Sequence, residues 1–493
     1  MLAATLIALP TLVPALPNLS NQDWLGWRGP GGNGVADGSP PLEWSEDKNV
    51  RWKIDIPGKG TSSPVVAGDL VFVTSAISIG EAEEPEEQPA QPERGRGGAG
   101  RGGRGSFGGR PEPTVEQEFL VIALNRTTGE VEWEQVPTSL TPHQGTHRDG
   151  SFASPTPVTD GEILIASFGS FGVFAYDMAG ELKWEKDLGD MDIVRDFGEG
   201  SSPVLHGNSL VMNWDHGGES FLVALNKNTG VELWRKEREV ATTWCTPLII
   251  ETESGPHVII GAAETIAYDL KTGEKQWSFG AVASAEASEP QRGEGAERGG
   301  EEGGRGGEEG GRGGPGQGRG GARGGSTGSG VITSPVHHRG ILLMSSGSRR
   351  GSFRAIALAQ AKADMKADAK ALLWSSEGDT PHIPSPIAYN GMFYSLKSNS
   401  GLLSAFEVAS GKRVYGPERM KGLGDTYASP VAAGGHLFFV GRDGTAEVVR
   451  AGKEFESVAI NILDEEFDAS PAIAGDEIFL RGRTALYCIA ADE

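Results

Sequence analysis

The stretch TSSPVVAGDLVFV, residues 61–73, is the first copy of a motif that recurs along the whole chain. Each copy has a Ser or Thr beside a Pro, then an apolar run, in most copies a Gly turn, and a second run of strand-forming residues. Self-similarity with a period of about 46 residues is typical of propellers and solenoids. Eight prolines mark the copies: Pro64, Pro157, Pro203, Pro247, Pro335, Pro386, Pro430 and Pro471.

The second half of the repeat is an apolar run, a Gly turn and a short run that ends in Trp. LVIALNRTTGEVEW ends at Trp133, and LVALNKNTGVELW ends at Trp234. Such runs predict about four short strands per repeat and no sustained helix. Four antiparallel strands make one blade, so the sequence predicts an all-β, eight-bladed propeller. A Trp at the same repeat position is expected to pack between blades: Trp52, Trp133, Trp184, Trp234, Trp277 and Trp374.

The two ends of the chain are expected to share one blade. Only three strands fit after Pro471, and the missing Trp-bearing strand is VRWKIDI, residues 50–56. Pairing this strand with the last three would close the ring and leave no open sheet edge. The predicted organisation is therefore a signal peptide and leader at 1–22, an N-terminal extension at 23–48, and the propeller at 49–493.

The opening segment, MLAATLIALPTLVPALP, is apolar and uncharged. It is too short and too interrupted by Pro for a transmembrane helix, and we interpret it as a secretory signal without a basic start. A disordered apolar tail is the alternative. Export to the periplasm or cell envelope is expected. Cys245 and Cys488 fall in repeats on opposite sides of the ring, so neither a disulfide nor a metal site is expected, and both are predicted to be buried apolar residues.

Two low-complexity segments interrupt the repeats at 81–113 and 285–329. Both are rich in Gly, Arg and Glu and are expected to be disordered. Their RGG triplets raise the question of RNA binding, but the first segment has seven Glu against five Arg and the second has eight Glu against six Arg. With a formal net charge of −23 for the whole chain, nucleic acid and anionic membranes are disfavoured as partners.

Unusual polar and aromatic residues gather in loops expected on one face of the ring. In an up-and-down blade, the loop entering the first strand and the loop between the second and third strands lie on the same face, which we call the top. Propellers bind ligands or partners at a mouth of the central channel, so these residues are binding candidates. They are His143, His147, Asp149, Trp214, Asp215, His216, Trp244, His382, Tyr427, Arg442 and Asp443.

Each candidate has a structural alternative. His143 and His147 would suit a metal only on a helix, and Pro142, Gly145 and Gly150 argue against one, so no metal site is predicted there. The run from Trp214 to His216 is either a ligand shelf or turn packing. Arg442-Asp443-Gly444 is most simply a charged tight turn. The sequence has no nucleophile elbow, HExxH, phosphate-binding loop or EF-hand, so no catalytic residue is predicted.

The repeat SPVxxGDxVFV…ALDxxTGExxW resembles that of the pyrroloquinoline quinone (PQQ) enzymes. This repeat builds the eight-bladed propellers of quinoprotein alcohol dehydrogenases and of BamB. The opening WRGPGGNG, residues 27–34, with the residues that follow, also resembles exported PQQ-like propellers of planctomycetes. The resemblance implies a quinone held under two adjacent cysteines, with calcium ligands and a catalytic Asp. Cys245 and Cys488 are single and far apart, and no motif here matches the calcium ligands, so PQQ and calcium are disfavoured.

The sequence therefore predicts an exported, non-catalytic propeller that acts as a BamB-like scaffold for a protein partner or ligand, as a monomeric ring. Two alternatives remain. The first is a quinone-dependent or other enzyme at the top face. The second is a carbohydrate-binding propeller of the envelope, with Trp214 and Trp244 as stacking platforms.

Overall fold

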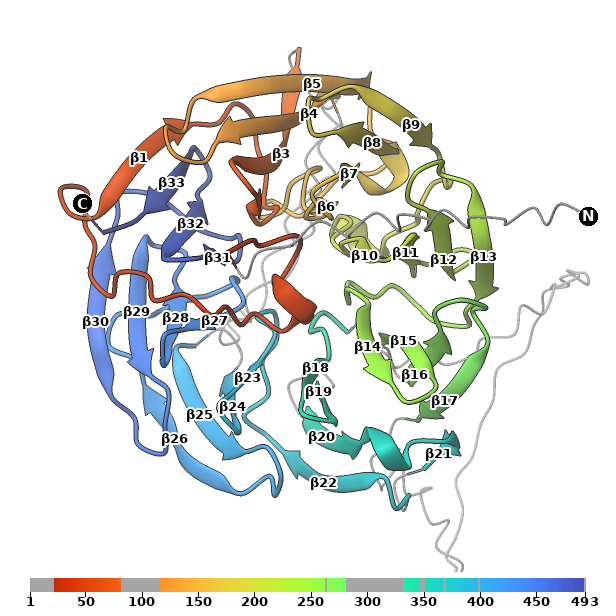
Figure 1. The fold of residues 1–493 in the computed structure, drawn as a ribbon, viewed down its shortest axis with the longest axis vertical. Coiled ribbons are helices and arrows are strands. Elements are labelled where there is room, and N and C mark those ends of the chain that lie inside the picture. The colour runs from red at the N-terminus through yellow and green to blue at the C-terminus, as the bar shows by residue number, and fades with distance from the viewer. Residues whose placement is uncertain are drawn as a thin grey trace, which may run out of the picture.

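The structure, a computed structural model, describes residues 22–80, 115–261, 264–280, 331–345, 351–366, 369–397 and 400–491. In these ranges the strands form eight sheets around a central axis (Figure 1). The predicted all-β, eight-bladed propeller is confirmed. The predicted signal peptide and the inserts at 81–113 and 285–329 lie outside the described residues, apart from Gln22.

Every blade has four antiparallel strands, and the first lies nearest the channel (Figure 1). Blades 1 to 4 comprise β2 (Val65–Ala67), β3 (Leu70–Ile79), β4 (Glu116–Asn125) and β5 (Val131–Leu140); β6 (Val158–Thr159), β7 (Ile163–Ser167), β8 (Val173–Asp177) and β9 (Leu182–Lys186); β10 (Val204–His206), β11 (Ser209–Trp214), β12 (Phe221–Asn226) and β13 (Glu232–Glu237); and β14 (Leu248–Thr252), β15 (Gly255–Ile260), β16 (Thr265–Asp269) and β17 (Lys275–Phe279).

Blades 5 to 8 continue in the same order around the ring. They comprise β18 (Val336–His338), β19 (Ile341–Ser345), β20 (Ser352–Ala357) and β22 (Leu372–Glu377); β23 (Ile387–Tyr389), β24 (Met392–Leu396), β25 (Leu402–Glu407) and β26 (Arg413–Arg419); β27 (Val431–Ala433), β28 (His436–Val440), β29 (Thr445–Arg450) and β30 (Ser457–Ile462); and β31 (Ala472–Ala474), β32 (Glu477–Arg481), β33 (Ala485–Ile489) and β1 (Val50–Asp55).

Blade 8 closes the ring with strands from both ends of the chain. β1 pairs antiparallel with β33, with Trp52 opposite Cys488 and Lys53 opposite Tyr487. The Ile56 amide extends the ladder by donating to the Thr484 carbonyl (2.8 Å). The predicted closure by an N-terminal strand is therefore confirmed, and the described first and last blades leave no sheet edge between them.

Blade 4 departs from the expected four strands. β21 (Ala363–Met365) pairs in parallel with β17, so this sheet has five strands. β21 belongs to the Ala/Lys/Asp-rich insert that precedes Trp374 in blade 5. Asp364 accepts a hydrogen bond from Ser278 Oγ (2.9 Å) and pairs with Lys275 Nζ (2.7 Å), so the insert ties blade 5 to the outer edge of blade 4.

The repeated Trp joins its own blade to the next one. Trp234 of blade 3 is buried and donates its indole N–H to the Leu270 carbonyl of blade 4 (2.8 Å). Its ring covers Gly273, where an added Cβ would lie 2.7 Å from the ring and where φ is +70°. The Thr-Gly turns are therefore glycine because an indole lies on them. The same indole-to-carbonyl bond is made by Trp52, Trp133, Trp184 and Trp374.

The Ser or Thr before each repeat proline links the blades near the channel. Its hydroxyl oxygen accepts a hydrogen bond from the backbone N–H of the equivalent residue in the preceding blade, as from Ser385 to Ser429 (2.9 Å) and from Ser429 to Ser470 (2.9 Å). The eight residues are buried, and seven of these links run from Ser63 to Ser470. They are Ser63, Thr156, Ser202, Thr246, Ser334, Ser385, Ser429 and Ser470.

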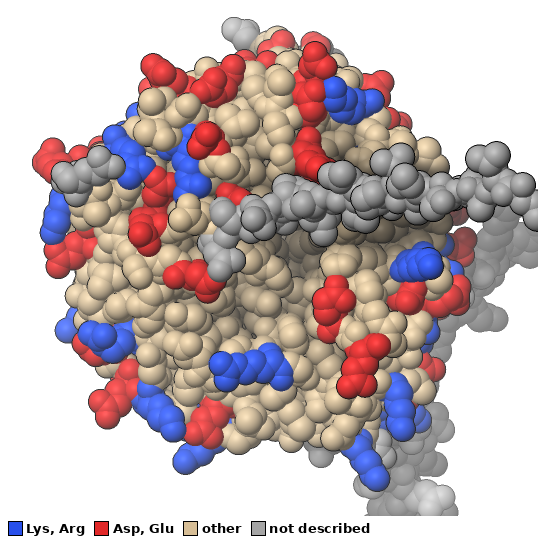
Figure 2. Space-filling view, in the orientation of Figure 1, with Lys and Arg blue, Asp and Glu red and all other residues tan. Residues whose placement is uncertain are grey.

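Residues 23–39 of the N-terminal extension fill the channel from the face opposite the top. η1 (Pro30–Gly32) lies at the centre of the ring (Figure 1). The extension also contacts the turns between first and second strands, because Asp23 accepts from the Gly68 amide (3.0 Å) and the Ser39 amide donates to Asp476 (2.6 Å). These turns lie on the bottom face. Charged side chains on the face crossed by the extension lie mainly toward its rim (Figure 2).

Backbone and side-chain hydrogen bonds fasten the extension to most blades. The Trp24 amide donates to the Val66 carbonyl of blade 1 (2.8 Å), and the Leu25 carbonyl accepts from the Thr159 amide of blade 2 (2.9 Å). Asn33 Oδ1 accepts from the His337 amide of blade 5 (2.9 Å), and the Gly34 carbonyl accepts from the Ala432 amide of blade 7 (2.8 Å). Arg28 is 1% exposed and donates to the carbonyls of Asn33 (2.8 Å), Pro386 (2.9 Å) and Ser385 (3.4 Å). The extension is thus an internal plug of the channel.

Candidate functional site

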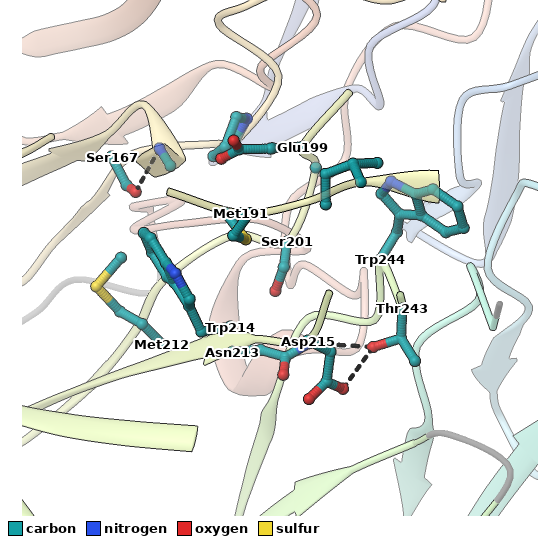
Figure 3. A pocket seen from close by; sticks show the side chains of 14 residues that line it. Ser167, Met191, Glu199, Ser201, Met212, Asn213, Trp214, Asp215, Thr243 and Trp244 are labelled. Carbon is teal, nitrogen blue, oxygen red and sulfur yellow. Dashed lines mark hydrogen bonds between the residues drawn. The ribbon is translucent and has the colours of Figure 1, made fainter. Parts of the chain in front are cut away.

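A small depression opens on the top face between blades 2, 3 and 4 (Figure 3). It encloses about 380 Å³, including the open space at its mouth. Its walls come from the end of β7, the end of β11 and the loops that enter β10 and β14. In Figure 3, Trp214 and Trp244 stand on opposite sides, with Glu199 at one end and Asn213 and Asp215 at the other. We call it the top-face depression.

Glu199 is the acidic group of the depression that has no basic partner. It is half-buried, and its two carboxylate oxygens accept hydrogen bonds from the Ser170 amide (2.8 Å) and the Ser170 hydroxyl (2.5 Å). An added Cβ on Gly169 would lie 1.5 Å from this carboxylate, so the close approach requires glycine. Burial raises the pKa of Glu199 to about 7, and the Ser170 hydrogen bonds only partly oppose this shift.

Asp215, a predicted binding residue, is used for structure. Its carboxylate forms a bidentate pair with Arg238 (2.7 and 3.1 Å) and accepts from the Thr243 hydroxyl (2.7 Å). Both side chains of the pair are buried, and Arg238 also donates to the Tyr268 hydroxyl of blade 4 (3.2 Å). Burial would lower the pKa of Arg238, but the Asp215 charge outweighs it and raises the pKa. The pair therefore joins blades 3 and 4 as a neutral unit.

Asn213, at the end of β11, was not among the predicted site residues. Its amide nitrogen donates to Thr243 Oγ1 (3.2 Å) and to the Cys245 carbonyl (3.2 Å). Its Oδ1 atom is buried and has no hydrogen-bond partner among the described residues. A buried acceptor without a donor costs free energy, so a donor placed beside Asn213 Oδ1 would be stabilising.

Trp214 and His216 are packed in the fold, which agrees with turn packing and not with a ligand shelf. Trp214 is 2% exposed, and its ring stacks on Phe221 at 5.9 Å between centroids. His216 is buried; its Nδ1 accepts from the Asp192 amide (2.9 Å), so its other nitrogen donates to the Glu219 carbonyl (3.1 Å). A stacking platform open to solvent at Trp214 is therefore wrong, because β12 supplies an apolar surface that takes the ring out of water. Trp244 remains half-exposed, with its indole N–H bound to the Gly198 carbonyl (2.7 Å).

His143 and His147 lie on the loop between β5 and β6 and have separate partners. His143 Nε2 lies 2.8 Å from the Met191 carbonyl oxygen, while His147 Nδ1 accepts from the Asp149 amide (3.2 Å). In the part of the chain that the structure describes, no group of three or more His, Cys, Asp or Glu side chains could hold a metal ion.

Asp149, Tyr427 and Arg442 are brought together by the fold. Arg442 pairs with Asp149 (3.1 Å), Asp425 (3.1 Å) and Asp468 (2.6 Å), and its guanidinium lies 4.0 Å from the centre of the Tyr427 ring. We call these five residues, together with Arg483 on Asp468, the blade-bridging cluster. It connects the loop after blade 1 to blades 7 and 8.

The basic and acidic side chains of the blade-bridging cluster pair with one another. Burial would raise the pKa of Asp149, but the hydrogen bond and charge of Arg442 outweigh burial and lower it. Burial would likewise lower the pKa of Arg442, but Asp468 and Asp425 raise it. Asp443 is exposed and accepts from the Thr445 amide (3.2 Å), as in the predicted charged turn. His382 is exposed on the loop that enters β23.

Both cysteines are buried and free, as predicted. Burial raises the pKa of Cys245 to about 11 and that of Cys488 to about 12. They are therefore thiols and not thiolates at neutral pH. Within the described ranges, no helix is long and apolar enough to cross a membrane.

Residues 35–279 match the family model described as "Outer membrane protein assembly factor BamB". The predicted resemblance to the BamB type of PQQ-like propeller is confirmed. Among curated proteins, no sequence matches this chain.

Several solved structures are similar to this chain. The quinohemoprotein alcohol dehydrogenase from Comamonas testosteroni is 10% identical with a TM-score of 0.58, covering 97% of this chain and 82% of that chain. A europium-containing methanol dehydrogenase is 10% identical with a TM-score of 0.57, covering 94% and 90%. BamB from Moraxella catarrhalis is 12% identical with a TM-score of 0.49, covering 75% and 90%. At these identities the two dehydrogenases establish likeness of fold and nothing more.

Proposed function

We propose that this protein is an exported, non-catalytic scaffold that binds a partner or ligand at its top face as a monomeric ring. The observation that carries the proposal is the plug. Residues 23–39 occupy the channel from the bottom face, and the top-face depression lies on the opposite face. The matched family, described as an outer membrane protein assembly factor, supports a binding role in the envelope.

The residues of the depression do not fit PQQ. This quinone carries three carboxylates and would need basic partners, yet the depression is lined by Glu199 and Asp215 and by no Lys, Arg or His. Calcium prefers six to eight oxygen ligands. Asp215 is already paired with Arg238, and both Glu199 oxygens already accept hydrogen bonds. We therefore assign no quinone step to this chain, and we propose that it acts without PQQ or calcium.

The carbohydrate alternative loses one of its two platforms. Trp214 is buried against Phe221, which leaves Trp244 as the half-exposed indole of the depression. One indole provides a single stacking surface. We therefore retain the scaffold as the proposed function.

Site-specific photo-crosslinking tests the proposal. A photoreactive residue is placed at exposed His143 on the top face, or at exposed Lys271 in a bottom-face turn as the matched control. Each protein is irradiated in its native envelope fraction. We expect a discrete crosslinked product from the top position and none from the bottom position. A discrete product from the bottom position alone, or stoichiometric quinone that co-purifies with dye-linked alcohol oxidation, would overturn the proposal.

A further inference from the structure

The charges around the top-face depression favour a cation. Asp215 is neutralised by Arg238 at 2.7 Å, so its charge is not available to a ligand. Glu199 has only hydroxyl and amide donors as partners, and no basic side chain lines the depression. A negatively charged ligand would meet an uncompensated carboxylate, whereas a cation would supply the missing opposite charge.

The buried acceptor makes the requirement more specific. Asn213 lines the depression and is 5% exposed, and its buried Oδ1 atom has no donor among the described residues. Its amide nitrogen is already committed to Thr243 and the Cys245 carbonyl, so the amide cannot turn round to satisfy itself. A hydrogen-bond donor that enters the depression beside Asn213 would satisfy this acceptor.

Two indole rings line the depression. Figure 3 shows the Trp214 and Trp244 rings on opposite sides, with Ser201 between them. Indole faces attract cations, and Trp244 is the half-exposed indole of this depression.

We propose that the top-face depression binds a primary ammonium group, such as the tip of a lysine side chain of a partner protein. Glu199 supplies the charge, Asn213 Oδ1 accepts one N–H, and the half-exposed indole of Trp244 flanks the alkyl stem. The inference rests on the proposed binding role of the top face and deepens it by naming the group that this face takes. An ammonium has three N–H donors, which suits two separate acceptors.

The test uses the full chain with 15N-labelled tryptophan and follows the Trp244 indole signal, assigned with the W244F variant. The probe is Nα-acetyl-lysine methylamide, and its Nε-acetylated form is the matched ligand without charge. At about pH 8 an alkyl ammonium is still protonated. We expect a saturable shift of the Trp244 signal with the lysine probe, and at least about tenfold weaker binding of the acetylated probe.

Two variants locate the charge that is responsible. Glu199→Gln should weaken the lysine probe by about tenfold or more, whereas Glu219→Gln, which removes a charge from an exposed neighbouring loop, should leave binding unchanged. The proposal is overturned if neither probe shifts the signal up to about 50 mM, if both probes bind equally, or if calcium chloride alone gives the same shift. Crosslinking from His143 could still succeed in each of these cases, so failure of this inference is distinguishable from failure of the scaffold function.

Discussion

Single side chains in this propeller do the same work at equivalent positions of successive blades. The hydroxyl of Ser429 accepts from the Ser385 amide, and the Ser429 amide donates to the Ser470 hydroxyl. Both Ser and Thr occupy this position in the ring of seven links, as Ser202 and Thr246 illustrate. What the position requires is therefore a hydroxyl oxygen and not a particular volume. The next residue is proline, which has no N–H and cannot donate a hydrogen bond to the neighbouring blade. The link between blades is therefore made by the amide and the hydroxyl of the Ser or Thr itself.

Ser429 provides a test of this ring. Ser429→Ala removes the acceptor of the buried Ser385 amide and should destabilise the protein by about 1–3 kcal/mol, because an unsatisfied buried donor costs that much. Ser429→Thr keeps the oxygen and should cost clearly less. Urea unfolding followed by Trp fluorescence measures both. Equal losses for Ala and Thr would mean that packing, and not the hydroxyl, matters at this position.

Glu199 predicts a dependence of stability on pH. Burial raises its pKa from 4.5 to about 7, so the folded state holds the proton more tightly than the unfolded state. Its stabilising contribution is complete below about pH 4.5 and is lost as the pH rises through about 7. Glu199→Gln cannot ionise and escapes this loss. His143 and Asp190 are the other charges that act on this carboxyl.

The melting temperatures of wild type and Glu199→Gln, compared from about pH 5 to about pH 8, check this sign. The melting temperature of Glu199→Gln should rise relative to that of wild type as the pH rises. The difference in melting temperature between the control Glu219→Gln and wild type should not change with pH. A difference for Glu199→Gln that shrinks with rising pH would contradict the raised pKa.

Whole strands and loops also depart from a uniform repeat. β1 completes blade 8 from the opposite end of the chain, and β21 adds a fifth strand to blade 4. Both devices join neighbouring parts of the ring by backbone hydrogen bonds. β1 is the stronger of the two, because it also carries Trp52, whose indole N–H reaches the Arg126 carbonyl of blade 1 (2.9 Å).

Two truncations separate the closing strand from the plug. Removing residues 1–56 deletes β1 and exposes the edge of β33, so we expect a large fall in melting temperature and aggregation through the open edge. Removing residues 1–38 deletes most of the plug and keeps β1, so a smaller fall with a soluble ring is expected. If the protein that lacks residues 1–56 melts at the same temperature as the full chain, closure by β1 does not stabilise the ring.

The whole molecule is held together at its centre as well as its rim. Arg28 is 1% exposed and donates to the carbonyls of Asn33, Ser385 and Pro386. Burial lowers its pKa to about 9, so it stays charged at neutral pH while buried in the channel. The blade-bridging cluster ties the loop after blade 1 to blades 7 and 8 on the opposite face. The ring is thus fastened at both mouths by residues distant in sequence.

Arg28→Met should reveal the contribution of the plug. The variant keeps an apolar stem and loses the hydrogen bonds, so we expect a loss of about 2 kcal/mol or more in unfolding free energy, as hydrogen bonds to a charged group are worth about 1.5–3 kcal/mol each. Lys271→Met, an exposed change on the same face, is the control and should be close to neutral. An Arg28 variant as stable as the control would show that the plug contributes little.

Several features of the molecule could be read from local sequence alone. The number of blades, the missing fourth strand at Trp52, the interblade role of Trp234 and the Gly beneath it all follow from a repeated pattern. Periodicity and turn chemistry are properties of neighbouring residues, so contiguous sequence carries them. The top-face position of Asp149, Tyr427 and Arg442 was likewise foreseen from the order of strands and loops.

The chemistry of the candidate site depends on contacts between loops, and these loops are not part of the repeated sequence pattern. A Trp at the end of a strand reads the same whether its ring meets water or Phe221, so the burial of Trp214 could not be anticipated. Glu199 acquires its raised pKa from the loss of water around it, which outweighs the opposing Ser170 hydrogen bonds. The path of residues 23–39 through the channel depends on hydrogen bonds to six blades. Such pairings are made when the closed ring brings distant segments together, because burial and partner choice exist only in the folded chain.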